Sequence, residues 1–423
     1  MIEDVLELVD KLWEGDEVIS TEQFHPVSGN FGKMVEVADD TAFVPSLANI
    51  SAFRTGGGLV LVDTGNEVFA RSNHAMVRTW TDEPLDAAVF SHGHIDHVFG
   101  VGPYEEEAAE KGWAQPTVFA HEHMPARFDR YQLTNGYNSV INQRQFQIPG
   151  LQWPMDYRYP DETYHDHHSI TVGDEVFELH HDKGETDDHT WTWIPGRKVV
   201  CPGDLVIWGS PNGGNPQKVQ RYPKEWAAAL RKMQALRPEI LLPGHGYPLL
   251  GADRVDQLLD DTATLLESLV EQTLALMNEG ASLDVILHTV QAPDGLLDRP
   301  YLRPVYDEPE FIVRNLWRLY GGWYDGNPSR LKPAPDADLA AELASMVGGA
   351  STLAARAIEL SAAGEHRLAC HLVEFAAKAA PDDKSVAQTR ADVYSARLAD
   401  ETSTMSKGIF NWAVKESTDR ANG

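Results

Sequence analysis

The stretch SHGHIDHVFG, residues 91–100, carries three histidines and one aspartate within six positions. These four residues are His92, His94, Asp96 and His97. The apolar run 86–90 in front of them predicts a buried strand, so the cluster lies in the loop after a strand end. Imidazole and carboxylate groups bind zinc, iron or manganese, and the spacing predicts two pairs of ligands, the first two residues for one metal and the last two for a second. A single loop histidine is more often solvated or hydrogen-bonded, but the complete pattern after an apolar strand favours a metal site.

The HxHxDH pattern of residues 92–97 resembles the defining motif of the metallo-β-lactamase superfamily. The segment 46–65 is similar to the first strands of that family, and its two apolar runs around a glycine-rich turn predict a hairpin. The resemblance implies that Asp63, at the end of this hairpin, braces the metal loop. The alternative is a turn-forming aspartate in front of Thr64 and Gly65.

The sequence Gly184-Glu185-Thr186 stands where the superfamily usually has Gly-His-Thr, whose histidine completes the first metal site. A glutamate at this point resembles the alkylsulfatase branch, and zinc accepts a carboxylate in place of an imidazole. The resemblance therefore implies that Glu185 is a ligand of the first metal. His181 and His189 remain alternative ligands for the same position.

Two later segments continue the family pattern in order. Residues 199–204 resemble a strand ending in Gly-Asp, which implies that Asp204 bridges both metals, although the long alkylsulfatases have a glutamate there. Residues 240–248 carry Pro-Gly-His-Gly after an apolar strand, which implies that His245 is a ligand of the second metal. In this scheme Asp96 and Asp204 are the catalytic carboxylates, and Asp96 also holds the nucleophilic water. The implied cofactor is two Zn²⁺ ions, and the same ligands also accept iron or manganese.

Residues 121–168 form a polar, aromatic and histidine-rich insert. Long loops of this kind tend to be functional, so we expect the insert to cover the metal centre and to supply cations for an anionic substrate group. The candidate substrate-binding residues are Arg127, Arg130, Tyr131, Asn138 and Arg144. Alternatively, the arginines pair with the surplus acidic side chains of the chain.

The C-terminal part of the chain is predicted to be helical. Apolar residues recur at helical spacing over 252–277, and residues 337–423 alternate alanine-rich helical patterns with turns, as in tetratricopeptide-like helix pairs. Between them, the aromatic-rich run 309–329 closely resembles the segment that joins the catalytic and dimerisation domains of alkylsulfatases. An incomplete helical array exposes an apolar face, which predicts a homodimer; the alternative is that the helices fold back on their own catalytic domain.

The resemblance implies an α/β fold, a metallo-β-lactamase αββα sandwich followed by an all-α dimerisation domain. We expect the catalytic domain at residues 1–250, a helical connection at 251–330 and the dimerisation domain at 331–423. We expect no sterol-carrier-like domain of the kind that ends the long alkylsulfatases.

The charge balance disfavours nucleic acid and anionic membranes as partners. The chain of 423 residues has 64 acidic and 35 basic residues and a formal net charge of −29. No apolar run is long enough to span a bilayer, and the amphipathic start, residues 1–13, predicts a helix and lacks the features of a signal peptide. With only Cys201 and Cys370, a disulfide framework is disfavoured and a cytoplasmic location is predicted.

Together these features predict a binuclear metal-dependent hydrolase that cleaves alkyl or related organic sulfate esters through a metal-bridging hydroxide. The substrate is expected to be a small anionic ester. Alternatives of the same fold are a hydrolase of carboxylic esters, lactones or phosphodiesters and a mononuclear iron oxidoreductase of the persulfide dioxygenase or flavodiiron kind. His94 argues against the flavodiiron form, which has a glutamate in the first motif. A non-catalytic dimeric scaffold is a further alternative.

Overall fold

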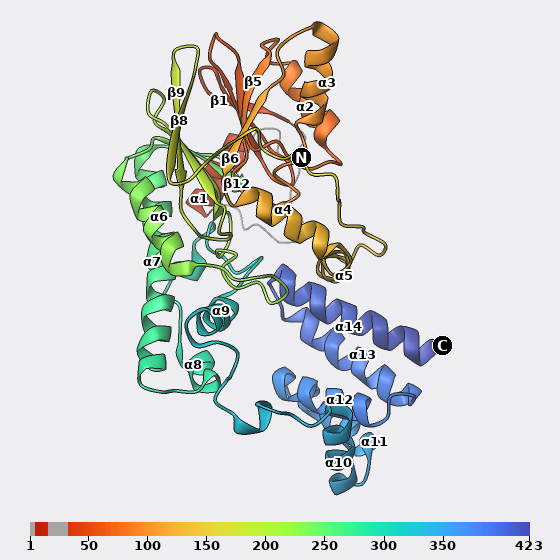
Figure 1. The fold of residues 1–423 in the computed structure, drawn as a ribbon. Helices are drawn as coiled ribbons and strands as arrows, with labels where there is room; N and C mark the ends of the chain where they lie inside the picture. Colours follow the sequence, from red (N-terminus) through yellow and green to blue (C-terminus); the bar gives the residue numbers. More distant parts are fainter. Residues whose placement is uncertain (1–4, 16–32) are drawn as a thin grey trace. The chain divides into compact units, whose positions relative to one another are not determined.

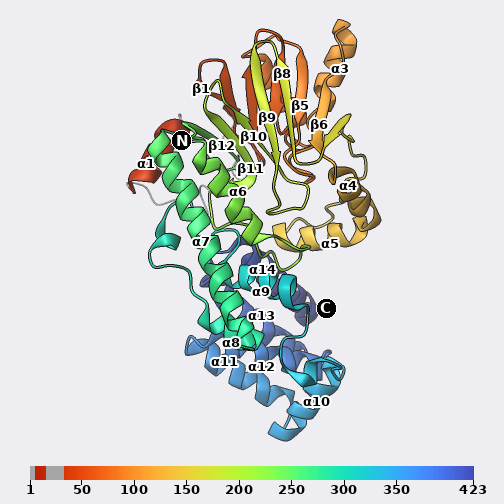
Figure 2. The same ribbon diagram turned by 60° about the vertical axis from the view of Figure 1, so that its left-hand side comes forward.

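The computed structural model describes residues 5–15 and 33–423 of the chain (Figures 1 and 2). The chain divides into two compact units. The first comprises Met1–Asn135 and Pro154–Gly322, and the second comprises Gly136–Trp153 and Trp323–Gly423. Helix α1 (Val5–Glu14) agrees with the amphipathic pattern at the start of the sequence, of which residues 1–4 lie outside the described residues.

The first unit contains a seven-stranded sheet in the order β1-β2-β3-β4-β5-β6-β7. Its strands are β1 Val35–Ala38, β2 Thr41–Val44, β3 Ile50–Arg54, β4 Leu59–Val62, β5 Leu85–Val89, β6 Thr117–His121 and β7 Glu162–Tyr164. Strands β1 to β4 pair antiparallel, and β4 to β7 pair in parallel. Strand β5, in front of the histidine cluster, is buried at four of its five positions, as is typical of a parallel strand covered on both faces.

A second, six-stranded sheet has the order β13-β12-β11-β10-β9-β8, which places β8 at one edge. Its strands are β8 His167–Val172, β9 Glu175–His181, β10 Thr190–Ile194, β11 Val199–Ile207, β12 Ile240–His245 and β13 Leu249–Leu250. Strands β11 and β12 pair in parallel, and the other neighbours pair antiparallel. All nine residues of β11 are buried, so this strand forms the centre of the sheet.

The two sheets pack face to face, and helices cover their outer faces (Figure 2). Phenylalanines of both sheets meet between them, and Phe53 contacts Phe177 with ring centroids 5.4 Å apart. Helices α2 (Ala70–Arg78) and α3 (Gly102–Lys111) pack on the first sheet. Helices α6 (Pro223–Ala235) and α7 (Ala252–Asn278) pack on the second. This order of layers confirms the predicted α/β sandwich.

The insert is not the long loop that we predicted. It folds into α4 (Met124–Leu133), in the first unit, and α5 (Asn135–Phe146), which lies in the second unit from residue 136 onward. The hydrophobic pattern of the sequence does not indicate α5, because most of the side chains that this helix buries are polar. Its buried residues are Asn138, Ser139, Ile141, Asn142 and Gln145.

The chain after α7 is helical, as predicted. Helices α8 (Leu283–Thr289) and α9 (Pro309–Gly321) belong to the first unit. The second unit contains α10 Asp336–Val347, α11 Ala350–Ala362, α12 His366–Ala379, α13 Lys384–Ala399 and α14 Thr404–Asn422. Small residues let these helices approach closely: a Cβ on Gly408 of α14 would lie 2.2 Å from the carbonyl oxygen of Gln145 in α5. Within the described residues, no helix combines the length and apolarity that a membrane crossing requires.

Candidate metal centre

The predicted ligands lie within strands of both sheets or in the loops that follow them. The histidine cluster follows β5, and Glu185 lies in the loop between β9 and β10. Asp204 lies within β11, and His245 is the last residue of β12. Two glycines bring the strands close enough for these side chains to meet: a Cβ on Gly203 would lie 2.7 Å from Cβ of Ser91, and one on Gly244 would lie 2.2 Å from Oδ1 of Asp204.

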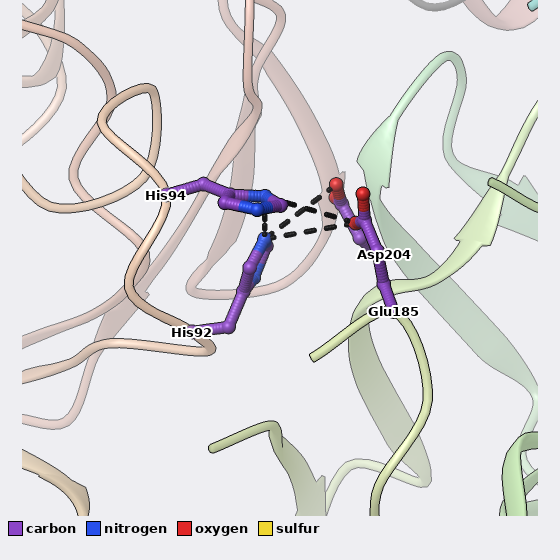
Figure 3. A group of neighbouring side chains, drawn as sticks. All are labelled: His92, His94, Glu185 and Asp204. Carbon is purple, nitrogen blue, oxygen red and sulfur yellow. Dashed lines mark hydrogen bonds and ion pairs between the residues drawn. The ribbon is translucent and has the colours of Figure 1, made fainter. Parts of the chain in front are cut away.

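The first group consists of His92, His94, Glu185 and Asp204, whose potential ligand atoms all lie within 4.8 Å of one another (Figure 3). His92 Nε2 is 3.7 Å from both Glu185 Oε2 and Asp204 Oδ2. His94 Nδ1 is 3.8 Å from Glu185 Oε2 and 2.7 Å from His92 Nε2. The side chains of His92 and His94 point toward those of Glu185 and Asp204.

The second group consists of Asp96, His97 and His245. Asp96 Oδ2 is 4.0 Å from His97 Nε2 and 3.5 Å from His245 Nε2. Asp204 reaches this group as well, because its Oδ1 is 3.4 Å from His97 Nε2 and its Oδ2 is 3.4 Å from His245 Nε2. The carboxylate of Asp204 therefore lies between the two groups.

The residues present fit divalent cations. His97 Nε2, Glu185 Oε2 and Asp204 Oδ1 are buried and have no hydrogen-bond partner, and all three face the other members of the groups. Buried polar atoms are normally hydrogen-bonded, so three such atoms facing one another form a donor set that a cation would satisfy. Nitrogen and carboxylate donors in groups of this size suit zinc.

Hydrogen bonds to the protein fix the Nδ1 atoms of His97 and His245. Asp63 Oδ2 accepts hydrogen bonds from His97 Nδ1 at 2.7 Å and from Ser91 Oγ at 2.8 Å, while its Oδ1 accepts from the Ser91 amide at 2.7 Å. His245 Nδ1 donates to the carbonyl oxygen of Leu47 at 2.6 Å. These contacts leave Nε2 of both histidines to face the two groups, as is typical of metal-binding histidines.

We expect the Asp63→Asn variant to bind the metal of the second group about 10- to 100-fold more weakly, because the amide cannot accept all three of these hydrogen bonds. Competition with a chelator measures the affinity. Asp40→Asn is a matched control, since Asp40 and Asp63 both have a positive φ, 56° and 59°. Equal metal affinity in both variants would show that Asp63 has no role in orienting His97.

Glu185 is positioned by two side chains that no sequence motif marks, those of Asn212 and Arg221. Its Oε1 accepts from Asn212 Nδ2 and lies 3.1 Å from Arg221 Nη2, while Arg221 Nη1 donates to the Glu185 carbonyl oxygen at 2.5 Å. Burial raises the pKa of the Glu185 carboxyl, Arg221 opposes this shift, and Asp204 adds to it. Fixing Oε1 in this way directs Oε2 toward His92 and His94.

The alternative ligands His181 and His189 are in neither group. His181 Nδ1 donates to the carbonyl oxygen of His189 at 2.8 Å, and its ring stacks on that of His121 with centroids 3.5 Å apart. His189 Nε2 donates to the carbonyl oxygen of Pro202 at 2.9 Å. The geometry therefore favours Glu185 over both histidines at the first group.

The predicted substrate-binding residues lie in different places. Arg127 is buried, with its Nε 2.8 Å from Asp188 Oδ1 and its Nη2 bonded to Asp187, which is the acid-pairing role considered as an alternative. Asp188 also accepts from the Gly93 amide, at 3.0 Å, so this pair supports the metal loop.

The other predicted residues are divided between the two units. The ring of Tyr131 lies 6.4 Å from that of His94, and the Arg130 guanidinium lies over the Tyr131 ring. Asn138 and Arg144 belong to α5 in the second unit.

Two further residues act electrostatically on the ligand groups. Burial and then Arg221 lower the pKa of Lys218 to about 7, while Asp96 and Glu185 act to raise it. Burial raises the pKa of Tyr306, and Glu185 and Asp96 add to that shift. Both residues lie in irregular segments, where neither a motif nor a hydrophobic period marks them.

Comparisons with known proteins agree with this geometry. Residues 44–245 match the metallo-beta-lactamase superfamily, and residues 282–420 match the alkyl sulfatase dimerisation family. The chain is 27% identical over 347 residues to a linear primary-alkylsulfatase of a Pseudomonas species, which covers 77% of this chain and 66% of the relative. It is 27% identical over 399 residues to an (R)-specific secondary-alkylsulfatase of Pseudomonas, covering 88% of this chain and 59% of the relative.

A solved structure has the same fold. The stereoselective inverting sec-alkylsulfatase Pisa1 from Pseudomonas superposes with a TM-score of 0.80 at 23% identity, over 92% of this chain and 66% of that one. The chain thus spans between 59% and 66% of the length of these three alkylsulfatases.

Proposed function

Because this chain combines a metallo-β-lactamase domain with an alkyl sulfatase dimerisation domain, we propose that it is a metal-dependent hydrolase of alkyl or related organic sulfate esters. The observation that carries this proposal is the pair of ligand groups that meet at the buried carboxylate of Asp204. The relatives named as alkylsulfatases support the choice of a sulfate ester. We also propose the boundaries 1–250, 251–330 and 331–423 for the catalytic domain, the connection and the dimerisation domain.

We propose two Zn²⁺ ions as the cofactor, with His92, His94 and Glu185 holding one and Asp96, His97 and His245 holding the other. A pair of divalent cations supplies Lewis acidity and lowers the pKa of water toward neutrality. The Asp204 carboxylate lies beside both groups, and its negative charge would balance part of the positive charge of the two cations. The Asp96 side chain is 24% exposed, more than Asp204 at 6%, so water from solvent reaches Asp96 more readily, and we propose that Asp96 holds the nucleophilic water.

Positive side chains near the ligand groups suit an anionic substrate. Lys218 interacts electrostatically with Asp96 and Glu185, and the nearby Arg130 contributes to the lowering of its pKa. We propose that Arg130, together with Lys218 in its protonated form, attracts the sulfate group, since charge-assisted hydrogen bonds are the strong contacts to oxyanions. Arg127 acts instead as a positioning residue for the metal loop. Its Nε donates a hydrogen bond to Asp188, and Asp188 accepts a second hydrogen bond from the Gly93 amide.

The other functions remain as alternatives. A hydrolase of carboxylic esters, lactones or phosphodiesters is favoured by one observation, the aspartate at position 204 where long alkylsulfatases have glutamate. A mononuclear iron enzyme is disfavoured because two ligand groups share Asp204. We further propose a cytoplasmic homodimer, which the match to a dimerisation family supports.

Release of inorganic sulfate from primary and secondary alkyl sulfates tests the proposal, with metal content measured on the same samples. We expect sulfate release that a chelator abolishes and added zinc restores. Hydrolysis of carboxylic or phosphoric esters without sulfate release would select the alternative substrates. A single iron per chain would overturn the binuclear hydrolase.

A further inference from the structure

We propose a separate divalent-metal site on the outer face of the β8–β9 hairpin, formed by His167, Glu178 and His180. One nitrogen or oxygen atom of each side chain lies within 4.8 Å of the others. None of the three belongs to the ligand groups described above, and all three lie in the first unit. The hairpin is labelled in Figure 1.

Strand register brings these residues to one face. His167 of β8 is directly opposite His180 of β9, and their ring centroids are 4.7 Å apart. Glu178 precedes His180 by two residues, so both side chains project from the same side of β9. The alternate residues Phe177 and Leu179 face the core between the sheets.

His180 is held in a fixed orientation. Its ring stacks on Trp191, the residue opposite it on β10, with centroids 4.1 Å apart and an interplanar angle of 12°. Trp191 is 2% exposed, and its Nε1 donates to Asp182 Oδ2 at 3.0 Å. The His180 ring therefore packs against a buried indole, which limits its rotation. This packing lowers the conformational entropy that the side chain would lose when an ion binds.

The distances suit a shared ion better than a hydrogen bond. His180 Nε2 is buried without a hydrogen-bond partner and lies 3.6 Å from Glu178 Oε2. Two ligands of one tetrahedral zinc, each at about 2.0–2.1 Å, lie roughly 3.3 Å apart, so a small movement completes the geometry. Burial and the neighbouring His167 lower the pKa of His180, which keeps this imidazole in the neutral form that binds metals.

The chemistry of the site indicates its class of ion. Two imidazoles and one carboxylate suit zinc, nickel or copper, and the open edge strand β8 leaves the remaining coordination position to water. A second histidine-rich group, His121, Glu122 and His165, is less suited, because its carboxylate, that of Glu122, is already paired with His165. There His165 Nδ1 is 2.5 Å from Glu122 Oε1, and His121 Nδ1 accepts from the His123 amide.

Equilibrium dialysis of the full chain against micromolar free zinc, followed by elemental analysis, tests this site. We expect Glu178→Gln and the double variant His167→Asn/Glu178→Gln to retain about one zinc fewer per chain than the wild type. The matched control is His288→Asn, which removes an exposed histidine of α8, and it should retain the wild-type zinc content. Equal zinc content in the wild type and both hairpin variants would overturn the proposal.

The measurement stands apart from the proposed sulfatase activity, because it compares zinc content between proteins that share an intact catalytic centre. We expect sulfate release to be unchanged in the hairpin variants. A Glu178→Gln protein with the wild-type circular dichroism spectrum but one zinc fewer supports the site even if no sulfate ester is cleaved. If the control His288→Asn loses as much zinc as the hairpin variants do, the zinc is bound by surface histidines in general. That result would also overturn the proposal.

Discussion

The Glu185→Gln variant is expected to bind one divalent cation fewer per chain and to lose at least ~10³-fold in kcat/KM, because one Lewis acid supplies several kcal/mol of transition-state stabilisation. Glutamine preserves the volume of the side chain. Arg221 and Asn212 both donate toward the Oε1 position, so the amide oxygen takes that place. The amide nitrogen then replaces Oε2 and cannot bind a cation.

His181→Asn is the matched control for this experiment, because it removes the alternative histidine from the same loop region. That variant should retain both cations, since His181 donates to a carbonyl oxygen and is in neither ligand group. Elemental analysis and the sulfate-release assay measure the two outcomes. Loss of a cation in His181→Asn together with full occupancy in Glu185→Gln would reverse the assignment of the third ligand.

The residues of the two candidate ligand groups could be identified from the sequence because most of them end or follow a recognisable strand, and Asp204 lies within one. The apolar runs before His92 and before His245 correspond to β5 and β12, and both are buried strands. The glycines at 203 and 244 belong to the same short motifs and permit the close approach of the strands. At these positions the short sequence motif contains both the proposed ligand and the glycine that its tertiary contact requires.

The supporting residues could not be predicted in this way. Arg221 is 1% exposed and reaches Glu185 across 36 positions of sequence, and nothing in its neighbourhood distinguishes it from a surface arginine. Arg127 was predicted to contact substrate, whereas in the structure its charge pairs with Asp188 and Asp187. Such partners are set by tertiary packing, which single-sequence patterns do not record.

Helix α5 of the insert shows a second reason why part of the fold could not be predicted from the sequence. Periodicity finds a helix when its buried face is apolar, and α7 was predicted for that reason. Helix α5 instead buries Asn138, Asn142 and Gln145, so its polar pattern indicated a loop. Asn142 Nδ2 donates to the Asn138 carbonyl oxygen at 2.8 Å, which satisfies part of this polarity within the helix itself.

Asp204→Asn should have the largest effect of any single substitution, a loss of at least ~10⁴-fold in kcat/KM, because in the proposed centre both cations depend on this side chain. Its two oxygens lie 3.4 Å from His97 Nε2 and 3.4 Å from His245 Nε2, and Oδ2 is also 3.7 Å from His92 Nε2. An amide offers one acceptor oxygen instead of two and no negative charge. We therefore expect metal content well below two ions per chain as well as inactivity.

The control for Asp204→Asn is Asp307→Asn, which alters another fully buried aspartate outside both ligand groups. Asp307 accepts from the amides of Gly214 at 2.6 Å and Glu308 at 2.7 Å. Asparagine leaves one of these amides without an acceptor, so stability should fall by about 1–3 kcal/mol while the bound metals remain. If instead Asp204→Asn retains two cations and Asp307→Asn loses them, Asp204 does not bridge the groups. Thermal unfolding and elemental analysis of both variants therefore separate a loss of metal binding from a loss of stability.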